Sequence, residues 1–145
     1  MPTRVIFLTG WSASGKSTIA RELQKKLGCN FLGTREVIHE LALKMGFKRI
    51  RAWLRSCGTK EVVKMSRAAM VEAIGGLNSS QDLIIDDAFD SKLPSAVKRT
   101  YSQADILVLH INATKAHRLE RMAKRLSVDE KGAVKESRLI DGFKK

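Results

Sequence analysis

Short apolar runs alternate with segments of helical spacing along this chain, and the alternation predicts an α/β fold. Strands are expected at residues 4–9, 29–32, 82–87 and 105–111. Helices are expected at residues 16–27, 34–46, 48–57, 59–74, 91–101 and 114–126, with a last helix after a polar break at 127–132. Strands and helices that alternate in this way favour one parallel sheet flanked by helices.

The segment between the first strand and the first helix carries the clearest chemical signal. Residues 10–18 read Gly-Trp-Ser-Ala-Ser-Gly-Lys-Ser-Thr and fit the phosphate-binding pattern G-x-x-x-x-G-K-[ST]. Two glycines allow a tight turn whose amide groups point at an anion, and the following helix adds the positive end of its dipole. A glycine-rich turn that binds nothing is the alternative. We expect ATP to be bound with Mg²⁺ by Gly10, Ser12, Ala13, Ser14, Gly15, Lys16, Ser17 and Thr18.

Within this loop two side chains have separate tasks. Lys16 can reach the β- and γ-phosphates as a point charge, and the Ser17 hydroxyl can ligate Mg²⁺. A phosphate-binding loop of this kind, called a P-loop, also needs an acidic residue at the end of a neighbouring strand to hold the metal ion or its water ligands. Asp86 and Asp87 follow the apolar residues 83–85 and meet this need. Because successive strand residues point to opposite faces, we expect one of the two aspartates to face the metal site. The alternative is that one aspartate caps the next turn.

Charge changes the range of partners that must be considered. The chain has 145 residues, enough for a single domain with its own core, and a formal net charge of +12. An excess of this size favours polyanionic partners, and nucleotide phosphates, RNA and DNA are all of this kind, although a lysine-rich solvated surface is the alternative.

No stretch is apolar for long enough to span a membrane, and residues 5–9 are expected as a core strand rather than a secretory signal. Two cysteines without metal-ligand spacing indicate reduced thiols, and hence a cytoplasmic protein.

Two segments hold much of the positive charge. Residues 44–67 contain eight basic residues and one acidic residue, and Arg51 and Arg55 lie one helical turn apart, where they could hold the phosphate of a second substrate. Trp53, between them, is expected to pack inside the protein. In the second segment, Arg118, Arg121 and Arg125 share one helical face, and Arg138 follows after the polar break. Such arginines can close over a triphosphate, whereas a solvated charged helix is the alternative for both segments.

The apolar stripe of the second basic segment is expected at Leu119, Met122 and Leu126. The three histidines, at positions 39, 110 and 117, lack the spacing of a metal site and are expected to be structural.

These motifs resemble the nucleoside monophosphate kinase group of P-loop kinases, which includes adenylate-kinase-related proteins, dephospho-CoA kinases and phage deoxynucleoside monophosphate kinases. Residues 85–89 are similar to the family element I-x-D-G-F/V, with Asp87 at the family aspartate. Residues 51–59 resemble R-x-x-L-x-x-x-G-T, and residues 121–125 resemble the lid pattern R-x-x-x-R. The resemblance implies a P-loop fold with strand order 2-3-1-4, an acceptor-side helical insertion at residues 34–77 and a lid-like segment at 114–138.

The resemblance also implies roles for individual residues. Lys16, Asp87, Arg121, Arg125 and Arg138 would act on the transferring phosphoryl group, and Arg35, Arg51 and Arg55 would face the acceptor. The sequence departs from the family at Asp90 and at His39, where many relatives carry arginine. Relatives also continue past the lid into a fifth strand and a final helix, so four strands are expected here.

The function expected from the sequence is transfer of the ATP γ-phosphoryl group to a small acceptor, a nucleoside monophosphate or related nucleotide. Two alternatives stay open. One is an ATP-binding protein that acts on nucleic acid, such as a polynucleotide end kinase or an RNA-processing factor. The other is a non-catalytic nucleotide-binding protein.

Overall fold

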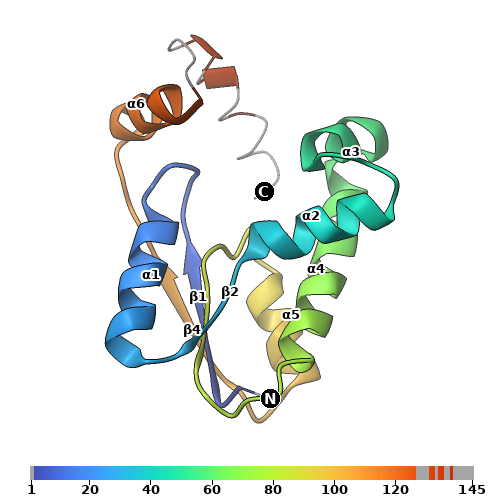
Figure 1. Ribbon diagram of the computed structural model, residues 1–145, viewed down its shortest axis with the longest axis vertical. Helices are drawn as coiled ribbons and strands as arrows, with labels where there is room; N and C mark the ends of the chain where they lie inside the picture. Colours follow the sequence, from blue (N-terminus) through green and yellow to red (C-terminus); the bar gives the residue numbers. More distant parts are fainter. Residues whose placement is uncertain (1, 127–130, 133, 136–137, 139–145) are drawn as a thin grey trace.

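The computed structural model describes residues 2–126, 131, 132, 134, 135 and 138. Its strands are β1 (Arg4–Thr9), β2 (Asn30–Leu32), β3 (Leu83–Ile85) and β4 (Asp105–His110). Its helices are α1 (Lys16–Leu27), α2 (Thr34–Lys44), α3 (Ile50–Cys57), α4 (Thr59–Gly75), α5 (Leu93–Thr100) and α6 (Lys115–Leu126). The order of strands and helices along the chain is the one that the apolar pattern predicts (Figure 1).

The strands form a parallel sheet in the order β2-β3-β1-β4, which confirms the expected order. Strand β1 lies between β3 and β4, with Phe7 opposite Ile85 on one side and Val108 on the other. Because all pairs are parallel, the carboxyl ends of the strands meet at one edge of the sheet. Ligands of open α/β sheets bind at this edge.

Alternating side chains of β1 enter two separate cores. Val5 and Phe7 join a large cluster with apolar residues of α2, α3, α4 and α5, whereas Ile6 and Leu8 join a smaller cluster with α1. All four side chains are buried. The result is three layers, with α1 on one face of the sheet and α4 and α5 on the other (Figure 1).

The loops at the carboxyl edge carry the two basic helices. Figure 1 shows α3 and α6 at the same end of the molecule, on opposite sides of the loop that joins β1 to α1. Helix α3 is fixed to the large core by Trp53, which is fully buried, as the sequence predicts. Helix α6 is held differently, because Met122 and the partly buried Leu119 pack on Ala13 of the β1–α1 loop.

Several predicted boundaries differ from those of the structure. Helix α3 begins at Ile50, two residues later than expected, because the backbone of Arg49 is extended. Helix α2 begins at Thr34, as expected, and the Thr34 hydroxyl does not cap the helix but donates a hydrogen bond to the carbonyl of Asp87. Strand β3 is shorter than the predicted 82–87, so that both aspartates lie just beyond it. Pro94 lies in the first turn of α5, where proline is tolerated.

Most of the predicted last helix, and the side chain of Leu126, lie outside the residues that the structure describes. Within the described part, no helix is both long and apolar enough to cross a membrane. Cys29 and Cys57 are both free thiols, as the sequence indicates, and burial raises the pKa of Cys29.

Candidate active site

The loop from Gly10 to Gly15 turns back on itself between β1 and α1. Gly10 and Gly15 have φ angles of +148° and +97°, and Ala13 has a φ of +58°, which is uncommon for a residue with a side chain. A hydrogen bond from the Ser14 amide to the Trp11 carbonyl, 3.3 Å long, closes the turn. Successive residues of positive and negative φ turn backbone amides toward one concavity, which is an arrangement that binds anions.

Lys16 is the first residue of α1 and is buried within this loop. Its ammonium group donates hydrogen bonds to the carbonyls of Gly10 and Trp11, at 3.1 and 2.7 Å. These contacts hold the charge directly beneath the concavity. The Ser17 and Thr18 side chains follow on the exposed side of the first turn.

A polar atom inside the loop lacks a protein partner. The Ser14 hydroxyl is buried and has no hydrogen-bond partner among the described residues. An unpaired buried hydroxyl costs about 1–3 kcal/mol, so its presence calls for an explanation. A bound phosphate oxygen would accept its hydrogen, and the residues of the loop therefore fit a nucleotide polyphosphate.

Asp86 and Asp87 lie next to the loop because β3 is the neighbour of β1. The Asp86 carboxylate accepts a hydrogen bond of 2.9 Å from the Thr34 amide at the start of α2. Burial raises the pKa of Asp86, and the nearby charges of Asp87 and Glu36 act in the same direction, whereas the bond from Thr34 opposes them. Thr34 thus ties the first turn of α2 to both aspartates, through its amide and its hydroxyl.

These groups line one cavity of about 310 Å³. It brings together the phosphate loop, both aspartates, two arginines of the α2–α3 side and one arginine of α6. Its apolar wall comes from α2, α3, α6 and the segment after β3. The lining residues are Ser12, Ala13, Ser14, Gly15, Lys16, Ser17, Thr18, Thr34, Arg35, Ile38, Ile50, Arg51, Leu54, Asp86, Asp87, Phe89, Met122 and Arg125.

The three arginines of α6 lie near the phosphate loop or its cavity, but their contacts differ. Arg125 lines the cavity, and Arg121 reaches across the phosphate loop, where its guanidinium donates a hydrogen bond of 3.2 Å to the Ala13 carbonyl. Arg118 is buried, with its guanidinium 5.7 Å from the centre of the Trp11 ring. Arg118 therefore lies against the phosphate loop, as Arg121 does, but it is buried there, whereas Arg121 and Arg125 are exposed. Arg138 is exposed and is not among the lining residues.

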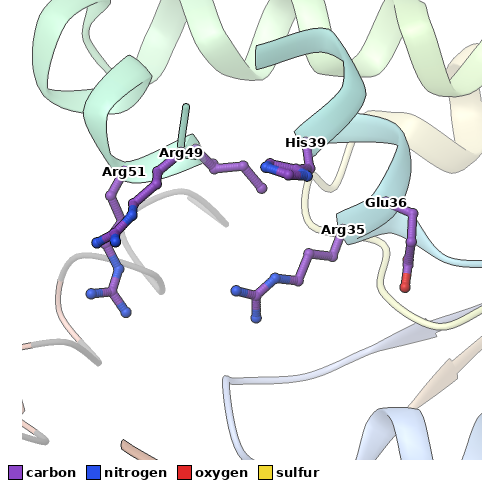
Figure 2. A pocket seen from close by; sticks show the side chains of 6 residues that line it. Arg35, Glu36, His39, Arg49 and Arg51 are labelled. Carbon is purple, nitrogen blue, oxygen red and sulfur yellow. The ribbon is translucent and has the colours of Figure 1, made fainter. Parts of the chain in front are cut away.

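Of the three arginines predicted to face the acceptor, Arg35 and Arg51 line the cavity, whereas Arg55 does not and is exposed on α3. A second cavity of about 450 Å³ lies alongside the first, and the two share Arg35, Ile50 and Arg51. Its other lining residues are Glu36, His39 and Arg49 (Figure 2). Sequence reasoning assigned no ligand to Arg49 or His39. The signal that was present is the run Lys-Arg-Ile-Arg at residues 48–51.

Asp90, which departs from the family pattern, is buried and pairs with Arg67 of α4. Its other oxygen accepts a hydrogen bond of 3.2 Å from the Lys92 amide. The pair fixes the segment after β3 to α4. Asp90 is thus explained by an internal ion pair rather than by a ligand.

The side-chain donor atoms decide which metal ion this site could hold. Within residues 2–126 and the few described beyond them, no group of three or more histidine, cysteine, aspartate or glutamate side chains could hold a metal ion by itself. Ser17, Asp86 and Asp87, which carry side-chain oxygens, all line the cavity of the phosphate loop. Hard oxygen donors of this kind, completed by phosphate oxygens and water, fit Mg²⁺.

Comparisons with known proteins bear on this arrangement. A shikimate kinase from Bacteroides thetaiotaomicron has a TM-score of 0.64 at 16% identity, over 94% of this chain and 76% of that one. A gluconokinase from Sinorhizobium meliloti 1021 has a TM-score of 0.62 at 14% identity, over 95% and 74% of the two chains. For a shikimate kinase from Acinetobacter baumannii in complex with shikimate, the TM-score is 0.59 at 17% identity, over 97% and 79%. At these identities the likeness shows a shared fold.

No curated protein matches the chain. The family described as an AAA domain, AAA_18, matches residues 6–141, which is nearly the whole chain. The protein therefore belongs to the AAA_18 family of P-loop proteins, and its fold is that of small-molecule P-loop kinases.

Proposed function

We propose that this protein transfers the γ-phosphoryl group of ATP to a small acceptor that carries a phosphate, a nucleoside monophosphate or related nucleotide. The observation that carries the proposal is the cavity itself. One space of about 310 Å³ is lined by the phosphate loop, by two carboxylates and by arginines from two sides. The kinases that share the fold support a phosphotransferase.

In this proposal the donor phosphates lie in the phosphate loop. The amides of residues 12–18 and the Ser14 hydroxyl bind phosphate oxygens. Lys16 exchanges its bonds to the Gly10 and Trp11 carbonyls for bonds to the β- and γ-phosphates. An ammonium held this close needs little rearrangement, so its charge is preorganised for the charge that develops during transfer.

Mg²⁺, when bound, would neutralise phosphate charge and hold the β- and γ-phosphates in a reactive geometry. Ser17 would hold the ion directly, and Asp87 or Asp86 would bind its water ligands. Asp86 is fixed by the Thr34 amide, so its carboxylate is oriented before any ligand arrives.

The acceptor phosphate would lie between Arg35 and Arg51, facing the phosphate loop. One of its oxygens attacks the γ-phosphorus as the bond between the γ-phosphorus and the β–γ bridging oxygen breaks, and ADP leaves with the bond's electron pair. The acceptor phosphate is ionised near neutral pH, and no proton has to be removed first. Arg55 stays a prediction as a more peripheral contact.

Arginines of α6 would complete the charge neutralisation. Arg125 lines the cavity, and Arg121 is within reach of the phosphates since it already spans the loop at Ala13. We propose residues 114–138 as the lid-like segment, with Arg138 closing over the transferring group, and residues 34–77 as the acceptor-side insertion. A cytoplasmic location stays a prediction.

A transfer assay tests the proposal. Labelled ATP with Mg²⁺ is offered to a panel of nucleoside monophosphates, dephospho-CoA and 5′-hydroxyl RNA. Lys16→Ala should lower transfer by at least about 100-fold, as expected for loss of a preorganised charge, while its circular dichroism spectrum is unchanged. Lys25→Ala, at an exposed lysine of the same helix, is the control and should retain full activity.

Three outcomes would contradict the proposal. Full activity of Lys16→Ala would refute the site assignment. Transfer to RNA alone would favour the nucleic-acid function. Binding of ATP without transfer to any acceptor would favour the non-catalytic alternative.

A further inference from the structure

Three of the six residues that line the second cavity are arginines, and a fourth is a histidine. Arg35, Arg49 and Arg51 extend into the same open space, and the imidazole of His39 lies beside it (Figure 2). Its volume of about 450 Å³ could accept a group many times the size of a water molecule, which takes up about 30 Å³. The cavity opens beside the proposed acceptor position, because Arg35 and Arg51 line both spaces.

The one acidic residue of the lining does not balance this charge. In Figure 2 the Glu36 carboxylate points away from the guanidinium groups. It lies over Gly33, where it fills the space that a side chain at that position would need. There it sits in the first turn of α2, where a negative charge is stabilised by the helix dipole. Neither Arg35 nor Arg49 forms an ion pair within the part of the chain that the structure describes.

His39 is oriented by the neighbouring loop. Its Nε2 lies 3.3 Å from the Lys48 carbonyl, which can only accept a hydrogen bond, so Nε2 is the donor of this contact. The bond connects α2 to the loop before α3 and holds the ring at the wall of the cavity. Arg49 itself has an extended backbone and makes no side-chain cap to α3.

We propose that this cavity binds a second phosphate group of the acceptor, held by Arg49 with Arg35. The inference rests on the proposed function, and it narrows the acceptor to phosphate esters with two separate phosphates, such as nucleoside bisphosphates. Like charges that converge on one cavity repel each other, and an anion relieves that repulsion. A phosphate, with a charge of about −1.5 to −2, balances several cations better than a carboxylate with a single charge, and arginine binds it through two hydrogen bonds.

Matched pairs of acceptors test this inference by binding, independently of transfer. The probes are the 5′-monophosphates and the 3′,5′-bisphosphates of the four ribonucleosides. Each is titrated by calorimetry into protein that is already saturated with Mg²⁺ and a non-hydrolysable ATP analogue. For at least one ribonucleoside, the bisphosphate should bind at least about tenfold more tightly than the monophosphate, because a single charge-assisted hydrogen bond already gives about this factor.

Variants at Arg49 identify where the second phosphate binds. Arg49→Ala should remove the tenfold preference and leave the affinity for the monophosphate unchanged, and Arg49→Glu should reverse the preference. Folding is not expected to suffer, because Arg49 contacts α3 through its backbone carbonyl, which bonds to the Trp53 amide. Arg99→Ala, at an exposed arginine of α5, is the control.

Equal binding of every matched pair would overturn the inference, as would a preference that survives Arg49→Ala. Selective binding of a bisphosphate with no transfer to it would leave the phosphate subsite standing and refute the proposed function instead. The two failures are therefore distinguishable.

Discussion

Gly10→Ala and Gly15→Ala form a matched test of how tightly the phosphate loop is built. Both glycines have positive φ angles, +148° and +97°, that cost a residue with a side chain about 1–3 kcal/mol. They differ in the space around them. A Cβ at Gly10 would lie closer than 3.0 Å to the backbone carbonyl oxygen of Ile111, whereas a Cβ at Gly15 meets only Arg121, at an ordinary 3.8 Å.

The clash at Gly10 cannot be relieved by rotating a side chain, because the Ile111 oxygen belongs to the backbone that leaves β4. Forcing such an overlap costs about a further 1–3 kcal/mol. We therefore expect Gly15→Ala to lower the free energy of unfolding by about 1–3 kcal/mol and Gly10→Ala by about 2–6 kcal/mol. The gap between the two variants is the steric contribution.

Urea unfolding followed by far-ultraviolet circular dichroism measures both values. With a denaturant slope of about 2 kcal/mol per molar, the Gly10→Ala midpoint should fall by about 1–3 M. Gly10→Ala should also lose affinity for MgATP, since the loop can accommodate the methyl group only by moving away from Ile111. A Gly10→Ala protein as stable as Gly15→Ala would refute the reasoning, because the close approach to Ile111 would then carry no energetic weight.

Two further predictions concern the acidic residues after β3. Burial raises the pKa of Asp86 above its ordinary value of 3.8. At a pH just above 3.8, the folded state therefore keeps the proton of this carboxyl group, whereas the unfolded state has lost it. The free energy of unfolding therefore falls as pH rises through this window, and Asp86→Asn should lack that fall. Urea unfolding of both proteins between about pH 4 and about pH 7 measures the difference. Parallel dependence of the free energy of unfolding on pH in the two proteins would contradict the prediction. Arg67→Ala leaves the buried Asp90 without its partner and should cost about 3 kcal/mol, whereas Arg67→Ala combined with Asp90→Asn should cost less, because no unpaired charge remains. An equal loss in both proteins would show that the ion pair is not the source of the effect.

Much of the fold follows from local sequence signals. The run from Val5 to Thr9 is apolar on both faces because β1 is central and buried on both sides, and such a run has few other interpretations. The phosphate loop is equally local, since its glycines are required by its own backbone angles. The strand order came from the resemblance to P-loop kinases, and the structure confirms it.

What the sequence could not predict depends on contacts between segments far apart in the chain. Helical spacing places Arg118 with Arg121 and Arg125, but the packing of Trp11 against α6 decides which of them is buried. Likewise, Thr34 is a good helix cap by residue type. Its hydroxyl turns instead to the Asp87 carbonyl, because β2 and β3 are neighbours.

The second cavity could not be predicted from the sequence for a similar reason. Arg35 and Arg51 belong to different helices, and only the path of the chain between α2 and α3 brings them to one space. Arg49 joins them because its extended backbone delays the start of α3. A loop conformation of this kind leaves no periodic signal.

The two tryptophans of this chain lie in opposite surroundings, and this gives the protein two internal fluorophores. Trp11 is 43% exposed on the phosphate loop beside Arg118, whereas Trp53 is fully buried on the core-facing side of α3. The emission of Trp11 should be red-shifted and should respond when a nucleotide fills the loop, while that of Trp53 should change only when the core opens. With one tryptophan replaced by phenylalanine at a time, one variant would report occupancy of the loop and the other would report global unfolding, without an added dye.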